Sequence, residues 1–205
     1  SRADPDNAQI DPENWLLHYF SGRRLEAEVI RDSLLAVSGG LRRDLYGTSV
    51  RPYITKYQQG KAKPASGPLD GDGRRSIYLE VRRNFLVPMF LAFDYPLPTG
   101  TAGRRGVSAS ASQALFMLNN ELVAQQAERW AQRLLAEQQD VGQRIETMFL
   151  EAFGRAPDLA ERETCLAFLD EHKRRYGSST DPVNLRVWSD LCHMLVSTVE
   201  FIFIQ

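Results

Sequence analysis

The sequence is 205 residues long and 43% hydrophobic, which is enough apolar material to bury a core in one large domain or two small ones and argues against a disordered chain. Its formal net charge is −1, divided as 16 lysines and arginines against 12 acids in residues 1–105 and 9 against 14 in the remainder. Because this difference is small and diffuse, it does not supply the concentrated basic face of a nucleic-acid-binding protein, and we expect no nucleic-acid partner.

The N-terminal part is predicted to be an entry segment followed by a helix. The entry segment covers residues 1–24 and is polar over 1–14, with a turn or helix start at Asp11–Pro12. A helix is predicted over 25–37, because Gly39–Gly40 supplies a C-terminal stop and the apolar residues recur three and four positions apart: Ala27, Ile30, Leu34 and Val37.

A β-hairpin with a long loop is predicted as an insertion over about 48–82. The segments 50–55 and 76–81 have strand character, and 60–73 between them is rich in proline and glycine, which is typical of a loop. In the second strand the apolar residues occupy every other position, as in a half-buried strand: Ile77, Leu79 and Val81.

Proline and serine positions set the boundaries of the next elements. Pro88 is predicted to open a short helix over 89–93, and the prolines that follow keep 94–98 extended. Ser110 and Gln113 have the spacing of a capping box, which predicts the start of a helix of about six turns. One apolar stripe follows that helix: Leu115, Leu118, Leu122, Ala127, Trp130 and Leu134.

The C-terminal part is predicted to be three helices with short connections. The first runs from Val141 and ends at Gly154, the second begins at a capping box of Asp158 and Glu161 and ends near Tyr176, and the third spans 185–195. The predicted fold is therefore mainly α, a helical bundle-like domain with a small β-hairpin insertion. Its predicted parts are the entry segment 1–24, a helical body over 25–138 and a C-terminal three-helix bundle over 139–205 packed on that body.

Sequence motifs for catalysis or cofactor binding are absent. There is no phosphate loop, dinucleotide fingerprint, nucleophile elbow, His-Glu-x-x-His or haem-attaching Cys-x-x-Cys-His, so we expect no cofactor in this chain. The segment Asp70-Gly71-Asp72-Gly73 suggests calcium, but Arg74 and Val81 stand at ligand positions of such a loop. Three soft ligands could meet on the C-terminal helices, although two cysteines among apolar residues are usually small core residues: Cys165, Cys192 and His193.

Arginine outnumbers lysine 21 to 4, and six Arg-Arg pairs occur along the chain. Guanidinium groups favour planar contacts with carboxylate, sulfate or phosphate, and those groups can belong to a ligand or to the protein itself. The ligand interpretation, in which tyrosine rings stack on sugars, predicts anion or glycan contacts at Arg74, Arg75, Tyr78, Arg82, Arg104 and Arg105. The internal interpretation, which we favour, predicts a structural polar network of Arg24, Glu28, Arg31, Asp32, Asp94 and Gln113.

Four blocks of sequence in order carry a family resemblance. They are RRLEAEVIRDSLLAVSG (23–39), RRSIYLEVRRNFLVPMFLAFDYP (74–96), RRGVSASASQALFMLNNELVAQQA (104–127) and the closing pair GRAPDLAERETCLAFL and WSDLCHMLVSTVEF. Together they resemble a planctomycete C-terminal domain of unknown function, number fifteen-fifty-three, over nearly the whole chain. The resemblance implies an exported, periplasmic or cell-surface protein, cytochrome-like partner domains and a link to polysaccharide use, but no catalytic residues.

The sequence and the resemblance leave three hypotheses for the function. The leading hypothesis is a non-catalytic interaction or scaffold domain of an exported, cytochrome-linked multidomain protein. The first alternative is a binding module for acidic or sulfated polysaccharide, and the second is a hydrolase that uses carboxylates such as Glu28, Asp32 or Asp94, which must face each other across a cleft. We expect no membrane-spanning segment in this chain, because it has no run of about 18 apolar residues.

Overall fold

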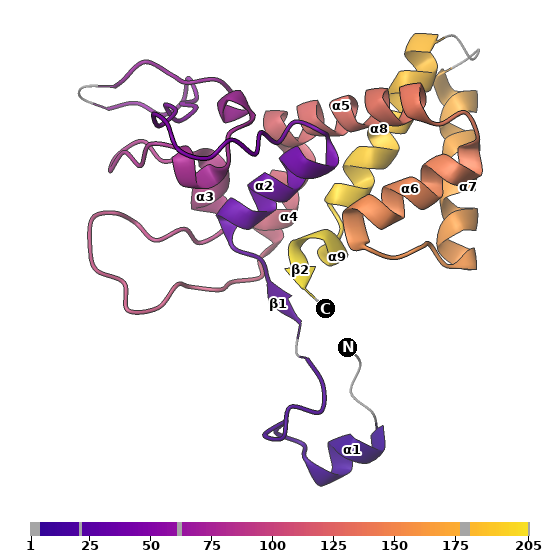
Figure 1. Ribbon diagram of the computed structural model, residues 1–205, viewed down its shortest axis with the longest axis horizontal. Helices are drawn as coiled ribbons and strands as arrows, with labels where there is room; N and C mark the ends of the chain where they lie inside the picture. Colours follow the sequence, from indigo (N-terminus) through magenta and orange to yellow (C-terminus); the bar gives the residue numbers. More distant parts are fainter. Residues whose placement is uncertain (1–4, 21, 61–62, 177–180, 205) are drawn as a thin grey trace.

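A computed structural model describes residues 5–20, 22–60, 63–176 and 181–204 (Figure 1). Within these ranges the fold is mainly helical with a small two-stranded antiparallel sheet, which confirms the predicted class. The helices and strands, in chain order, are α1 (Pro5–Ile10), β1 (Arg23–Arg24), α2 (Ala27–Val37), the 3-10 turns η1 (Gly71–Gly73) and η2 (Ser76–Tyr78), α3 (Pro88–Ala92), α4 (Ala111–Asn119), α5 (Glu121–Glu137), α6 (Val141–Phe153), α7 (Leu159–Tyr176), α8 (Asp181–Val196), α9 (Val199–Ile202) and β2 (Phe203–Ile204).

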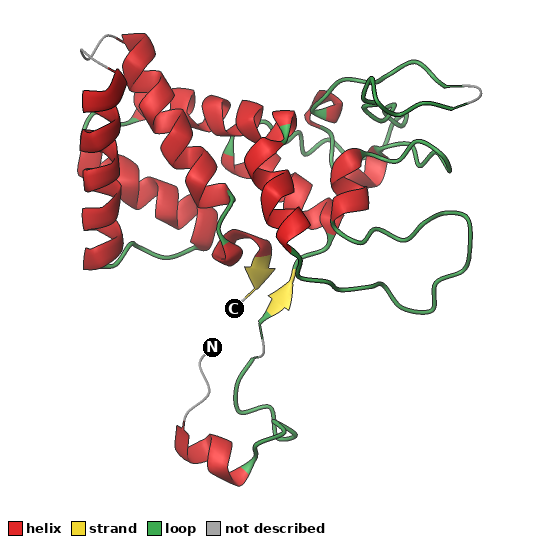
Figure 2. Ribbon diagram, turned by 180° about the vertical axis from the view of Figure 1, so that it is seen from behind, coloured by secondary structure: helices red, strands yellow, loops and turns green. Residues whose placement is uncertain are grey.

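A continuous hydrophobic core joins the body to the C-terminal helices. Most of the buried apolar side chains among the described residues belong to this cluster, which extends from α2 and α3 through α5 to α6, α7, α8 and α9, with the Trp130 and Trp188 side chains fully enclosed. Helix α8 packs more extensively on α5 than on any other helix. Figure 2 shows the C-terminal helices α6, α7 and α8 toward one end and the long loops at the other. The C-terminal helices therefore share their core with the body.

Helix boundaries follow the local signals in the sequence. Helix α2 buries the predicted face, and α3 has Pro88 in its first turn. Helix α6 ends at Gly154, whose φ of 71° lies in the left-handed region that glycine adopts at low cost. Asp158 and Glu161 exchange the two predicted capping bonds, each 2.8 Å long, at the start of α7.

The long helix predicted after Ser110 is instead two helices. The predicted Ser110–Gln113 capping box opens α4, but Asn120 has extended backbone angles (φ −82°, ψ 131°), and its side chain accepts a hydrogen bond from the Leu122 amide, which starts α5. Asparagine competes with helix formation because its side chain can bond to nearby backbone amides. The predicted apolar stripe is correct from Leu122 onward and wrong at Leu115 and Leu118, which are exposed.

The small sheet lies elsewhere than predicted. Its strands are β1 and β2, paired antiparallel with Arg24 opposite Phe203, so the start of the body meets the end of the chain. Neither 50–55 nor 76–81 forms a strand; they share one parallel bridge between Val50 and Leu79, and Ile77 is exposed. The alternating pattern failed here because side chains of α2 hold residues 70–76 in tight turns, as described below.

The segment before β1 extends away from the body in both views (Figures 1 and 2). It contains α1 and a turn in which the Asp11 carboxylate accepts hydrogen bonds from the Trp15 and Leu16 amides at 2.8 and 2.7 Å. Its large apolar side chains are exposed: Ile10, Trp15, Leu16, Leu17 and Phe20. Among the described residues, no helix combines the length and apolar character needed to cross a lipid bilayer.

Candidate functional site

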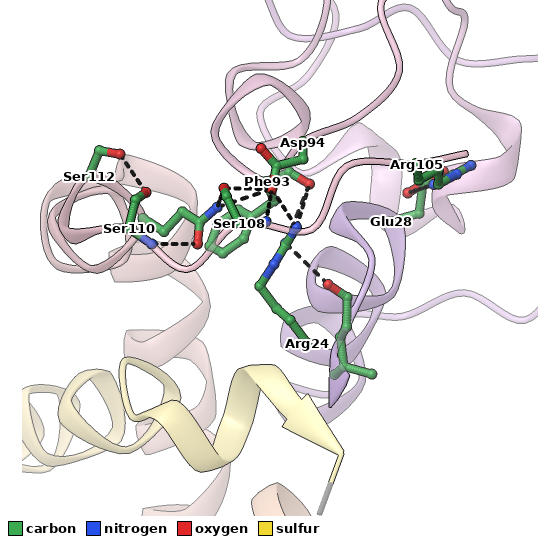
Figure 3. Close-up of polar contacts among 10 residues, drawn as sticks. Arg24, Glu28, Phe93, Asp94, Arg105, Ser108, Ser110 and Ser112 are labelled. Carbon is green, nitrogen blue, oxygen red and sulfur yellow. Dashed lines mark hydrogen bonds and ion pairs between the residues drawn. The ribbon is translucent and has the colours of Figure 1, made fainter. Parts of the chain in front are cut away.

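Arg24 lies at the centre of a polar cluster between β1 and the end of α3. Its guanidinium is almost wholly buried and donates to the Asp94 carboxylate at 2.7 Å. It also donates to the backbone carbonyls of Phe93, at 3.4 Å, and Leu25, at 3.3 Å (Figure 3). A buried guanidinium is tolerated only with such partners, so this cluster fixes β1 against the segment that follows α3.

Asp94 extends the cluster to the far end of the loop that begins after it. One carboxylate oxygen accepts from the Ser108 amide at 2.8 Å and from the Ser108 hydroxyl at 2.7 Å, and the buried Gln113 side chain lies within 3.5 Å. Burial alone would raise the pKa of Asp94, but the bonds from Ser108 and the charge of Arg24 together lower it. The serine-rich stretch of the sequence therefore both caps α4 and closes the 94–108 loop.

Arg31 fixes residues 70–76 in place through hydrogen bonds, as Arg24 does for the segment after α3. Its buried guanidinium donates to the carbonyls of Asp70 at 2.6 Å and Arg74 at 3.0 Å, and to the Ser76 hydroxyl at 3.0 Å. Asp32, the next residue of α2, accepts from the Ser76 amide and hydroxyl at 2.8 and 2.7 Å. Burial lowers the pKa of Arg31, and the nearby carboxylates raise it in part. These bonds hold the turns that replace the predicted second strand.

Arg105, near the end of the 94–108 loop, fixes this loop to α2. Its guanidinium donates to both Glu28 carboxylate oxygens, at 2.8 and 2.9 Å, and lies 3.1 Å from the Glu26 carboxylate. The hydrogen bonds with Glu28 raise the pKa of Arg105, against the effect of burial. Figure 3 shows this pair to the right of the cluster around Arg24. Helix α2 and the residues just before it thus bind two loops through arginine and acid contacts.

Four of the five arginines predicted to contact a ligand have protein partners: Arg105, as described above, and Arg74, Arg75 and Arg82. Arg74 is buried, with its guanidinium 4.0 Å from the centre of the Tyr78 ring and 2.5 Å from the Tyr46 carbonyl oxygen. Arg75 lies 3.6 Å from the Asp32 carboxylate, and the exposed Arg82 pairs with Glu80 at 2.7 Å. Of the six predicted contacts, Arg104 and Arg105 line the hollow described next, and Arg74, Arg75, Tyr78 and Arg82 do not.

A hollow of about 700 Å³ lies beside the Arg24 cluster. Four arginines and two acids line it, together with apolar side chains such as Phe20 and Phe203: Arg23, Arg24, Arg104, Arg105, Glu26 and Asp94. Arg24 and Arg105 are paired as described, whereas Arg23 and Arg104 form no ion pair with any described residue. The charge left over is positive, so this hollow suits an anionic group.

The carboxylates that could serve a hydrolase are held by arginines. Glu28 binds Arg105, Asp32 lies between Arg31 and Arg75, and Asp94 binds Arg24. A catalytic acid needs a raised pKa, and that of Asp94 is lowered. Among the described residues, no group of three or more His, Cys, Asp or Glu side chains is placed to hold a metal ion. Burial raises the pKa of Cys165 and of Cys192.

Two features of this region were not found from the sequence. Arg23 and Glu26 line the hollow, but neither was predicted as a site residue. Arg23 could have been identified from its place beside Arg24, because adjacent residues of an extended segment point to opposite sides. Glu26 carried no comparable signal, since its relation to Arg105 depends on the path of a distant loop.

Comparison with known proteins gives one match. A family model described as PSD1, protein of unknown function (DUF1553), matches residues 1–169. No curated protein matches. No solved structure matches either.

Proposed function

The chain belongs to the PSD1 family, whose function is unknown (DUF1553), and we propose that it is a non-catalytic interaction domain that receives an anionic group of its partner in the arginine-lined hollow. Following the resemblance, its setting in this proposal is an exported multidomain protein with cytochrome-like domains. The rigid arginine network supports this function, because it positions the walls of the hollow without leaving a carboxylate free for chemistry.

The observation that carries the proposal is the unequal pairing of four neighbouring arginines. Arg24 and Arg105 form ion pairs with the protein's own acids, and Arg23 and Arg104 form none within the described residues, although all four line one hollow. Guanidinium groups without an ion pair can form two parallel hydrogen bonds with sulfate or carboxylate, and these charged hydrogen bonds are stronger than those with water. Phosphate is a weaker candidate only because the sequence resemblance points to polysaccharide.

A polysaccharide carrying sulfate or carboxylate groups is the partner that we propose first. A chain of repeated anionic units can place one group between Arg23 and Arg104 while sugar rings lie on the apolar walls, which include Phe20 and Val107. Such binding depends on charge, so it weakens as salt is added. A partner domain with an exposed acidic segment would use the same contacts without sugars.

Calorimetry with matched polymers tests this proposal. We expect dextran sulfate to bind at least about tenfold more tightly than uncharged dextran, and the double variant Arg23→Ala and Arg104→Ala to remove that difference. The matched control is Arg51→Ala with Arg83→Ala, since both residues are exposed arginines without a described ion pair and lie outside the hollow. Equal binding of both polymers, or equal loss in both double variants, would contradict the proposal.

The hydrolase alternative is tested on the same protein. If carboxylates acted on a polysaccharide, Asp94→Asn would abolish product formation in an assay for new reducing ends. We expect the unaltered chain to release no reducing ends from neutral or sulfated polymers, because each candidate carboxylate is held by an arginine.

A further inference from the structure

A second cavity, of about 480 Å³, lies where four separate segments meet. Its walls come from the 53–57 loop, Leu69, the start of α3 and the break between α4 and α5. Its volume is within the usual range of about 300 to 1,000 Å³ for small-molecule sites. The helix break at Asn120 is therefore more than an interruption of the predicted helix, because it places three polar residues on the rim: Asn119, Asn120 and Glu121.

The floor of this cavity is apolar and its rim combines aromatic rings with polar groups. Leu69, Val87, Met89 and Leu122 form the floor, and all but Leu69 are buried. On the rim Tyr53 is half-buried, and Tyr57 has 80% of its surface exposed, with the Lys56 ammonium 5.1 Å from the centre of its ring. An exposed aromatic ring beside an apolar floor offers a flat surface for a ligand with both apolar and polar faces.

The polar groups of the rim retain hydrogen-bonding capacity. The Tyr53 hydroxyl donates to one Glu121 carboxylate oxygen at 3.4 Å, which leaves the other oxygen as an acceptor. The Asn120 side chain uses its oxygen on the Leu122 amide, and the Asn119 side chain uses its nitrogen on the Leu115 carbonyl, so the Asn120 nitrogen remains as a donor and the Asn119 oxygen as an acceptor. The charges of Lys56 and Glu121 cancel, so no net charge favours an ionic ligand at this rim.

We propose that this cavity binds a neutral sugar unit. Sugar rings have apolar C–H faces that stack on tyrosine and neighbouring hydroxyls that both donate and accept hydrogen bonds, and the rim supplies acceptors at Glu121 and Asn119 and a donor at Asn120. The ring stacks on Tyr57, and its hydroxyls bond to Glu121 and Asn120. This site differs from the arginine-lined hollow in residues and in charge, and it does not depend on the function proposed for that hollow.

NMR titration of the whole chain with three neutral tetrasaccharides tests the inference, using cellotetraose, maltotetraose and mannotetraose at millimolar concentration. We expect at least one to bind, with Tyr57→Ala and Glu121→Gln each weakening it about tenfold. The matched control is Tyr46→Ala, because Tyr46 is as exposed as Tyr57 and makes its hydrogen bonds only through backbone atoms.

Each result of the titration either supports or overturns sugar binding in this cavity. Binding that is lost in the Tyr57 and Glu121 variants and kept in the Tyr46 variant supports it, provided that all variants keep the circular dichroism spectrum of the parent. Absence of binding to all three sugars, or binding unchanged in both cavity variants, overturns it. The double variant Arg23→Ala with Arg104→Ala should bind the neutral sugar as the parent does, so failure of the hollow and failure of this cavity are distinguishable.

Discussion

The two Arg-Arg pairs at 23/24 and 104/105 show how adjacent arginines acquire different roles. Arg24 is buried and bound to Asp94, while its neighbour Arg23 is exposed and forms no ion pair with a described residue. In the second pair Arg105 binds Glu28, and Arg104 faces the hollow without a described ion pair. One member of each pair thus supports the fold, and the other is available to a ligand.

The difference within the first pair follows from backbone geometry, because successive residues of the extended β1 point in opposite directions and only Arg24 enters the protein. A buried guanidinium must find a carboxylate, because it is costly when unpaired. Arg104 and Arg105 are both exposed, and they differ because only Arg105 forms ion pairs with described acids, Glu26 and Glu28. The comparison predicts that inward arginines govern stability and outward arginines govern binding.

The largest effect is expected at Arg31, the most enclosed of the inward arginines. Arg31→Ala leaves the Asp70 and Arg74 carbonyls without their donor and the Asp32 carboxylate without its nearest charge. Loss of a buried charged partner costs about 3 to 5 kcal/mol, and we expect the free energy of unfolding to fall by that amount. Urea denaturation followed by circular dichroism measures it, and a loss below about 1 kcal/mol would contradict a supporting role for Arg31.

Substitution of each member of the first pair compares the two roles directly. Arg24→Met should lower the free energy of unfolding by about 2 to 3 kcal/mol, because charged hydrogen bonds to Asp94 and Phe93 are lost. Arg23→Met is the matched control and should change it by no more than about 0.5 kcal/mol. Similar losses from both substitutions, measured by the same urea titration, would show that Arg23 and Arg24 do not differ in their contribution to stability.

Acid should weaken the Arg24 cluster in a defined direction. The pKa of Asp94 is lowered in the folded protein, so its stabilising effect is complete above the unfolded value of about 3.9 and is lost as the pH falls through the folded value. The parent should therefore exceed Asp94→Asn in stability most clearly at neutral pH, and the gap should narrow below about pH 4. Thermal unfolding across this pH range measures the gap, and a gap that stays constant would contradict the assignment.

The smallest effect is expected at Arg105, whose pair is partly exposed. The side chains of Arg105 and Glu28 are 38% and 23% exposed, so solvent screens their attraction. Arg105→Ala should cost about 0.2 to 1 kcal/mol, and added salt should reduce the difference from the parent. A matched urea titration at low and high salt checks both statements, and a salt-independent loss of several kcal/mol would place Arg105 with the inward group.

Secondary structure was predictable where its cause lies within one or two helical turns. The capping boxes at Ser110 and Asp158 and the stop at Gly154 were found from the sequence because each joins residues only a few positions apart. The apolar periods of α2 and α5 were likewise local. The prediction failed where a local alternative won, as at Asn120, and where a distant side chain reshaped the chain, as Arg31 does at 70–76.

The sequence by itself determined the helical class, the main helix boundaries and the polar residues to consider, because periodicity and capping act over short chain distances. Only the tertiary structure decided which arginines are satisfied. Arg24 meets Asp94 across 70 positions and Arg105 meets Glu28 across 77, and no local pattern specifies such contacts. The two cavities likewise depend on segments brought together by the core, since a cavity is formed by the packing of surfaces and not by any one of them.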